Sequence, residues 1–232
     1  MASEATNEEL RAAREALAEA IRAREVLLSS VSHDLRNPLN TFAMSAGLLR
    51  DDIERGDIDA TRALSLLARM DRAVERMQRL IDDLHEASLI EAKGIELARA
   101  SVSTAVIVEE AVKAAAELLK DRGIDVGNGH IEPKKVDVDR ARIVQALAKL
   151  TTYCARATGE GGAITISAEA GDGAVTLAVR AVGPRGAAIR LEPGKGGLAL
   201  LIAGGLVEAH GASLVDQSDT AVRWAFTLPA VS

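Results

Sequence analysis

One histidine in this sequence has the neighbours that phosphoryl chemistry needs. His33 is followed directly by Asp34, and Asn37 lies one helical turn further along the same helix face. A carboxylate beside an imidazole can orient the ring or accept its proton, which leaves the other ring nitrogen nucleophilic. An amide one turn away can position a water molecule or a partner's acyl phosphate. These residue types predict phosphoryl transfer through His33.

The element that must position His33 is a helix. Apolar residues recur at heptad spacing, and His33 is two residues from both Val31 and Leu35, roughly 200° around the helix from each. His33 is therefore expected to face away from the buried seam. An ordinary solvated histidine would have the same position, so position alone leaves both interpretations open. Pro38 predicts a local bend beside the histidine. The residues of the heptad stripe are Leu10, Leu17, Ile21, Leu28, Val31, Leu35 and Phe42.

A second heptad helix follows a break at Gly56-Asp57. Asp57 or Asp59 is expected to cap it. Two such helices cannot bury their apolar seam alone, so the sequence predicts a homodimer in which two hairpins form a four-helix bundle. The second stripe consists of Ala63, Leu67, Met70, Val74, Met77, Ile81 and Leu84.

The stretch Ser32-His33-Asp34-Leu35-Arg36-Asn37-Pro38-Leu39 resembles the H-box of two-component sensor histidine kinases, whose signature is H-[ED]-x-x-[NT]-P. The resemblance runs from about Glu25 to Leu228. It implies that His33 carries the phosphoryl group, that Asp34 supports its nucleophilicity, and that Asn37 serves in dephosphorylating a response regulator. Arg36 is expected to contact the partner and help neutralise charge during transfer.

The C-terminal part predicts an α+β domain whose order of elements resembles the ATP-binding (Bergerat-type) α/β sandwich of the same family. Helices are expected from Ser103 or Thr104 to about Arg122, after Asp139, and from about Gly197 to Ala209. Gly171-Asp172-Gly173 is typical of a hairpin turn. The expected strands are 124–126, 135–138, 163–170, 174–181, 212–215 and 222–228.

This domain lacks the polar residues that the resemblance requires for ATP. Lys149 and Tyr153 stand where the family has two asparagines, and a tyrosine offers no amide oxygen for Mg²⁺. Ala181 replaces the aspartate that receives the adenine amino group, and a methyl group cannot accept that hydrogen bond. Ala199 stands where a glycine is usual. Gly194-Lys195-Gly196-Gly197 fails the G-x-x-x-x-G-K-[ST] spacing and is interpreted as the remnant of a lid.

Composition argues against several classes of function. The net charge of -6 and the four aromatic residues in 232 argue against a surface that binds nucleic acid. No stretch is apolar enough for a membrane span, and the single cysteine, Cys154, excludes an intramolecular disulfide and suits the cytoplasm. His85 and His130 have no acid or cysteine partners at metal spacing, so no metal site is predicted. His210 lies at a helix end, where the helix dipole is expected to favour the protonated imidazole.

The sequence thus predicts an α plus α/β protein: a helical hairpin that forms a dimeric four-helix bundle, followed by a degenerate ATP-binding-like domain. The expected function is phosphotransfer between the aspartates of two receiver domains through His33, with Mg²⁺ supplied by the receiver and no cofactor of its own. The alternatives are an active but divergent kinase, a response-regulator phosphatase that uses Asn37, and a non-catalytic receiver-binding scaffold. The predicted regions are a coiled-coil extension (1–24), a dimerisation and phosphotransfer domain (25–93) and the ATP-binding-like domain (94–232).

Overall fold

The computed structural model describes residues 2–56, 59–92, 94–191, 197–219 and 221–231. The chain divides into two compact units, Met1–Leu84 and His85–Ser232. The first contains helix α1 (Ala2–Arg55) and most of α2 (Ala60–Glu91), and the second contains the last turns of α2 and a mixed α/β domain. The predicted order, helices followed by an α/β domain, is confirmed.

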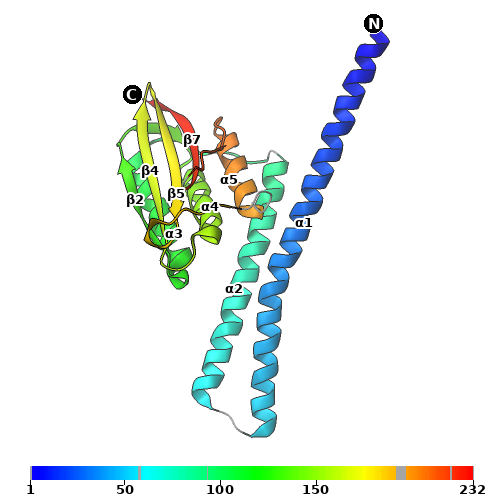
Figure 1. Ribbon diagram of the computed structural model, residues 1–232, viewed down its shortest axis with the longest axis vertical. Helices are drawn as coiled ribbons and strands as arrows, with labels where there is room; N and C mark the ends of the chain where they lie inside the picture. Colours follow the sequence, from blue (N-terminus) through cyan, green and yellow to red (C-terminus); the bar gives the residue numbers. More distant parts are fainter. Residues whose placement is uncertain (1, 57–58, 93, 192–196, 220, 232) are drawn as a thin grey trace. The chain divides into compact units, whose positions relative to one another are not determined.

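The first unit is a helical hairpin (Figure 1). Helix α1 continues unbroken through Pro38, although a proline removes one backbone donor from the helical ladder. At the turn, Gly56 has a φ of 67°, which glycine adopts without strain. The Asp59 carboxylate accepts a hydrogen bond from Thr61 N at 3.0 Å, so Asp59 caps α2 as predicted. Asp57, the other predicted cap, lies outside the described residues.

The apolar seam of the hairpin is only partly covered within one chain. Leu66 and Ala73 on α2 are buried, whereas Leu67, Val74 and Ile81, all members of the predicted stripe, are exposed. An exposed stripe remains because two helices bury only the side chains that lie between them. The ion pair between Arg62 Nε and Asp52 Oδ2, at 2.8 Å, joins the two helices near the turn.

In the second unit, helices pack on one seven-stranded sheet whose order is β1-β3-β7-β5-β4-β2, with β6 paired to β7 (Figure 1). β2 pairs with β4 in parallel, and the other pairings are antiparallel. Helices α3 and α4 contact the sheet, and α5 packs against α4. The elements are β1 (Ala100–Ser103), α3 (Thr104–Leu119), η1 (Lys120–Arg122), β2 (Asp125–Ile131), β3 (Lys135–Val138), α4 (Arg140–Thr158), β4 (Ala163–Gly171), β5 (Ala174–Val182), η2 (Pro184–Gly186), α5 (Gly197–Ala209), β6 (Val215–Asp216) and β7 (Val222–Val231).

Most of the predicted elements are present. The β4–β5 hairpin turns at Asp172 and Gly173, whose φ angles of 43° and 77° give the right-twisted turn that antiparallel strands favour. The Asp139 side chain accepts from Arg142 N at 3.2 Å and caps α4. Helix α5 has the predicted bounds.

Several predictions about this unit need correction. The strand expected at 212–215 is instead the short β6, Val215–Asp216. β1 was not predicted. β2 is longer than predicted, because the Gly-Asn-Gly sequence within it is locally typical of a turn. Ser103 occupies the N-cap position of α3 but makes no side-chain cap bond. The Thr104 hydroxyl does not cap the helix either, since it donates to Glu132 O at 2.9 Å and accepts from Lys134 N at 3.1 Å. These bonds fix the start of α3 to the β2–β3 connection.

His210 is a buried, neutral histidine at the end of α5, contrary to the expected cation. Its Nδ1–H donates to Leu206 O at 2.7 Å, and its Nε2 accepts the Asp139 backbone N–H at 3.0 Å. Burial lowers the pKa of His210, and Arg99, which reaches Ala209 O, lowers it further, although Leu206 O and Asp139 act in the opposite direction. Desolvation therefore outweighs the helix dipole here.

The lowered pKa of the buried His210 predicts that the stability of the fold depends on pH. Because the unfolded chain takes up a proton on this residue at a higher pH than the folded chain, the free energy of unfolding should fall as the pH is lowered from 7.5 to 5.5. A His210→Gln variant should be less stable at pH 7.5 but show a flatter pH dependence. Urea unfolding at four pH values measures both, and parallel pH profiles would contradict the assignment.

Candidate functional site

His33 is presented to solvent on α1 with an acid beside it. Its side chain is 70% exposed, and its Nδ1 lies 3.4 Å from Asp34 Oδ1. The tautomer that carries its proton on Nδ1, facing the Asp34 carboxylate, leaves the lone pair on the exposed Nε2. The Ser32 hydroxyl donates to Leu28 O at 2.8 Å and so belongs to the helix. His33 and Asp34 therefore have the geometry of an oriented, accessible nucleophile.

Asn37 and Arg36 are both exposed near this histidine. Asn37 lies four residues after His33, and its backbone carbonyl accepts the Thr41 hydroxyl at 3.1 Å. Asn37 and Thr41 also line a groove between α1 and α2. The hairpin therefore places His33, Asn37 and Thr41 on one face of α1, since residues four apart share a helix face.

Of the two positions where the resemblance has asparagines, the one held by Tyr153 belongs to the core. Tyr153 on α4 is only 4% exposed, and its ring meets Trp224 of β7 edge to face, with centroids 6.0 Å apart and an interplanar angle of 71°. Burial raises the pKa of Tyr153. Lys149, one turn earlier, is half-buried. An aromatic pair occupies this position, and it has no hard oxygen ligand for Mg²⁺.

The position where the resemblance has the adenine-binding aspartate is also buried. Ala181 is fully buried in β5, between Ile164 of β4 and Val222 of β7. A side-chain carbon on nearby Gly183 would lie 2.9 Å from the Ile189 side chain, which shows how closely Ile189 covers that glycine. Ala199 is half-buried on α5, and residues 192–196, with most of the remnant lid, lie outside the described residues. Among the described residues, Tyr153 and Ala181 do not offer the polar groups that the resemblance requires at these two positions.

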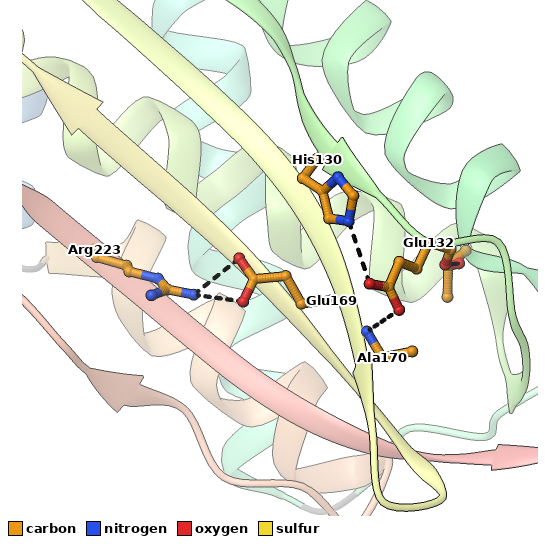
Figure 2. A network of polar contacts seen from close by, with 6 residues as sticks. His130, Glu132, Glu169, Ala170 and Arg223 are labelled. Atoms are coloured by element: carbon orange, nitrogen blue, oxygen red, sulfur yellow. Dashed lines mark hydrogen bonds and ion pairs between the residues drawn. The ribbon is translucent and has the colours of Figure 1, made fainter.

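A polar cluster on the exposed face of the sheet was not predicted (Figure 2). His130 Nε2 lies 3.3 Å from Glu132 Oε1, and the other Glu132 oxygen accepts the Ala170 N–H at 3.1 Å, so these contacts lower the pKa of Glu132. Arg223 of β7 reaches Glu169 of β4 across β5, at 3.4 Å. His130 thus has an acid partner that the sequence analysis missed, two residues further along the chain and so on the same face of an extended segment. The cluster ties β2, β4 and β7 together.

Three further observations concern the described part of the chain. It holds no group of three or more His, Cys, Asp or Glu side chains placed to bind a metal ion. Cys154 is buried, and burial raises the pKa of its thiol to about 12, so it is not a nucleophile at neutral pH. None of the helices in the described residues combines the length and apolar character that crossing a membrane requires.

Comparison with known proteins supports the phospho-acceptor interpretation of the hairpin. Residues 23–93 match the His Kinase A (phospho-acceptor) domain family. The chain is 29% identical over 227 residues to the sensor protein DivL of Caulobacter vibrioides, which covers 91% of this chain and 28% of DivL. It is 32% identical over 165 residues to the adaptive-response sensory kinase SasA of Parasynechococcus marenigrum, covering 68% of this chain and 39% of that protein. The chain thus spans less than half the length of these relatives.

Solved structures show the same fold. The Acinetobacter baumannii histidine kinase AdeS superimposes with a TM-score of 0.63 at 22% identity, covering 86% of this chain and 98% of that one. The histidine kinase ThkA, solved in complex with the response regulator protein TrrA, gives a TM-score of 0.61 at 23% identity, covering 97% of this chain and 66% of that one. At these identities the likeness extends to the fold alone.

Proposed function

Because this chain belongs to the two-component histidine kinase family, we propose that it is a histidine phosphotransfer protein of a phosphorelay rather than an ATP-dependent kinase. The observation that carries the proposal is a contrast between the two units. The exposed His33–Asp34 pair keeps the geometry of a nucleophile, whereas Tyr153 and Ala181 are buried where ATP chemistry would need polar groups.

The proposed step uses a receiver domain's aspartyl phosphate as donor. The His33 Nε2 lone pair forms an N–P bond as the O–P bond of the aspartyl phosphate breaks, and the receiver's carboxylate leaves with that electron pair. Asp34, at 3.4 Å from Nδ1, stabilises the positive charge that develops on the ring. Arg36 adds charge for the phosphoryl oxygens. The Mg²⁺ that neutralises the phosphoryl group belongs to the receiver, and the second transfer reverses the same bonds with another receiver.

Homodimerisation is part of this proposal. Three of the exposed apolar side chains of α2, Leu67, Val74 and Ile81, form one stripe, and Leu39 on α1 is 54% exposed. A second hairpin packed on this stripe would complete a four-helix bundle with the histidines outside. We also propose a cytoplasmic location, which suits a chain whose single cysteine is a free thiol.

Two measurements test the proposal. Calorimetric titration with ATP and Mg²⁺ should give no binding heat, and radiolabelled ATP should leave the protein unlabelled. Receiver domains charged with acetyl phosphate should label His33, with mass spectrometry locating the phosphoryl group. Micromolar ATP binding together with label on His33 would show instead an active, divergent kinase. Binding of receivers without any transfer would indicate a scaffold.

The exposure of Asn37 favours a second candidate, response-regulator phosphatase activity, in which the amide orients an attacking water. An Asn37→Ala variant should slow receiver dephosphorylation by about tenfold or more while leaving the labelling of His33 intact. A phosphatase should depend on Asn37 more than on His33. Equal loss of dephosphorylation in Asn37→Ala and His33→Gln would mean that the phosphoryl group leaves through the histidine.

A further inference from the structure

Helix α5 is apolar on nearly every side, so part of its apolar surface lies outside the core. Only Glu208 among its thirteen residues is charged. Ile202 and Leu206 are fully buried, whereas Leu200 and Leu201 are half-buried. A helix that is apolar all round is usually covered on every side. The outer face of α5 is therefore expected to contact a group beyond the core of the domain.

The last turns of α2 cover part of this outer face and leave a cavity beside it (Figure 1). A Cβ atom at Gly205 would overlap the Ile90 side chain, so the two helices are in close contact there. A Cβ atom at Gly204 would meet no atom within 4 Å. Both glycines line a cavity of about 810 Å³, and all of its lining residues belong to the second unit.

The two glycines have different explanations. Glycine in a helix interior is destabilising, so it needs a reason there. The contact with Ile90 requires Gly205, whereas no contact within the described residues requires Gly204. The missing side chain at Gly204 keeps the cavity open. This residue is therefore better explained by an occupant of the cavity than by packing within the chain.

The charges around the cavity favour a cation. Glu91 and Ala209, the last residues of α2 and α5, both line it, and so does Glu208. Neither helix has a basic residue in its last turn. Within the part of the chain that the structure describes, the two carboxylates have no hydrogen-bond or ion-pair partner. Since helix C-termini also carry partial negative charge, two such ends and two carboxylates attract a positive group.

Arg99 approaches the same end of α5 but does not line the cavity. Its guanidinium donates to Ala209 O at 3.3 Å and to Asp137 O at 3.5 Å, so it is engaged with backbone carbonyls. The carboxylates of Glu91 and Glu208 are therefore left for a group that enters the cavity.

We propose that this cavity binds a small amphipathic cation of the aliphatic amine class. Its apolar chain packs against Ile95, Leu200 and Leu201, and its ammonium group pairs with Glu91 and Glu208 at the helix ends. The cavity volume falls within the range of about 300–1,000 Å³ that is typical of small-molecule sites. This inference is independent of the proposed phosphotransfer function.

Other occupants match the lining less well. A fatty acid has the same apolar chain, but Glu91 and Glu208 would repel its carboxylate. A divalent metal ion takes about six or more oxygen ligands and gains nothing from apolar walls. The described residues also hold no group of three side chains placed to bind a metal. A second copy of the chain seated on this face would make the assembly state depend on the cavity, which the variants below measure.

The test titrates the full chain by calorimetry with three probes that differ only in the head group. The probes are octylammonium, octanol and octanoate. We expect one octylammonium to bind per chain at submillimolar concentration, about fivefold or more tighter than octanol and about 20-fold or more tighter than octanoate. Added salt should weaken the binding of octylammonium more than that of octanol, because it screens the carboxylates.

Two pairs of variants locate the site. Gly204→Phe places a ring in the cavity and should weaken octylammonium binding by about tenfold or more, whereas Gly204→Ala should stay within about threefold of wild type. Glu91→Gln/Glu208→Gln should bring the affinities for octylammonium and octanol within about twofold of each other. The control, Glu109→Gln/Glu160→Gln, removes the same charge from exposed residues that do not line the cavity and should keep the wild-type preference.

Three results would overturn the inference. The first is equal binding of the three probes, or no saturable binding of octylammonium up to about 1 mM. The second is wild-type affinity in a folded Gly204→Phe variant, or an unchanged preference in Glu91→Gln/Glu208→Gln, because the probe would then bind elsewhere. The third is a change of assembly state in Gly204→Phe on size-exclusion chromatography, which would mean that a second copy fills the cavity.

Discussion

Replacing His33 with glutamine is expected to abolish phosphoryl transfer while leaving the fold intact. His33 is 70% exposed, and its one side-chain contact in the described residues is the 3.4 Å approach to Asp34. Losing it should therefore change the free energy of unfolding by less than about 0.5 kcal/mol, as is usual for exposed positions. Removing the atom that forms the N–P bond should lower the transfer rate below about 0.1% of wild type. Single-turnover transfer from a charged receiver measures this rate.

A matched variant separates the nucleophile from the residue that supports it. Asp34→Asn keeps the shape of the side chain but removes the carboxylate that faces Nδ1. We expect this variant to transfer about 10- to 100-fold more slowly than wild type, with a shifted pH profile, because the ring loses its charge partner. Circular dichroism and size-exclusion chromatography should show both variants folded and in the wild-type assembly. Residual transfer above 1% in His33→Gln would place the acceptor elsewhere.

The fold could be predicted from local patterns wherever one signal determined an element. The heptad steps gave both long helices, Asp139 gave the start of α4, and Gly171-Asp172-Gly173 gave the β4–β5 turn. β1 was missed because its four residues are held by pairing with β3, a long-range contact without a local pattern. The cap of α3 was wrong because Thr104 bonds to the β2–β3 connection instead of its own helix.

The candidate site also divides into residues that local spacing predicted and residues that only the folded structure brings together. His33, Asp34 and Asn37 are contiguous on one helix, so their spacing alone brought them together. Spacing did not show that Arg69, Arg72 and Arg76 of α2 line a groove with Asn37, since only the packing of α2 on α1 brings these residues together. The His130–Glu132 contact could have been read from the two-residue spacing of a strand, whereas the neutral state of His210 depends on burial, which spacing does not show.

The second large effect is expected at Tyr153, a core residue at a position where the family resemblance has a metal ligand. Restoring the amide with Tyr153→Asn is expected to lower the free energy of unfolding by roughly 3–4 kcal/mol, since it removes a buried ring and leaves a polar group in its place. The lost contact with Trp224, at 6.0 Å between centroids, contributes to this cost. Urea unfolding followed by Trp224 fluorescence measures the change.

The same variant should not regain ATP binding, because one amide does not rebuild the site. Ala181 still offers no acceptor to an adenine amino group, and Ile189 still packs against Gly183. The control is Tyr153→Phe, which keeps the ring and should remain within about 1 kcal/mol of wild type, since the phenol oxygen has no hydrogen-bond partner among the described residues. Calorimetry with 1 mM ATP and Mg²⁺ should give no binding heat for either variant. Wild-type stability in Tyr153→Asn, with micromolar ATP affinity, would mean that the tyrosine lies over a nucleotide site instead of filling it.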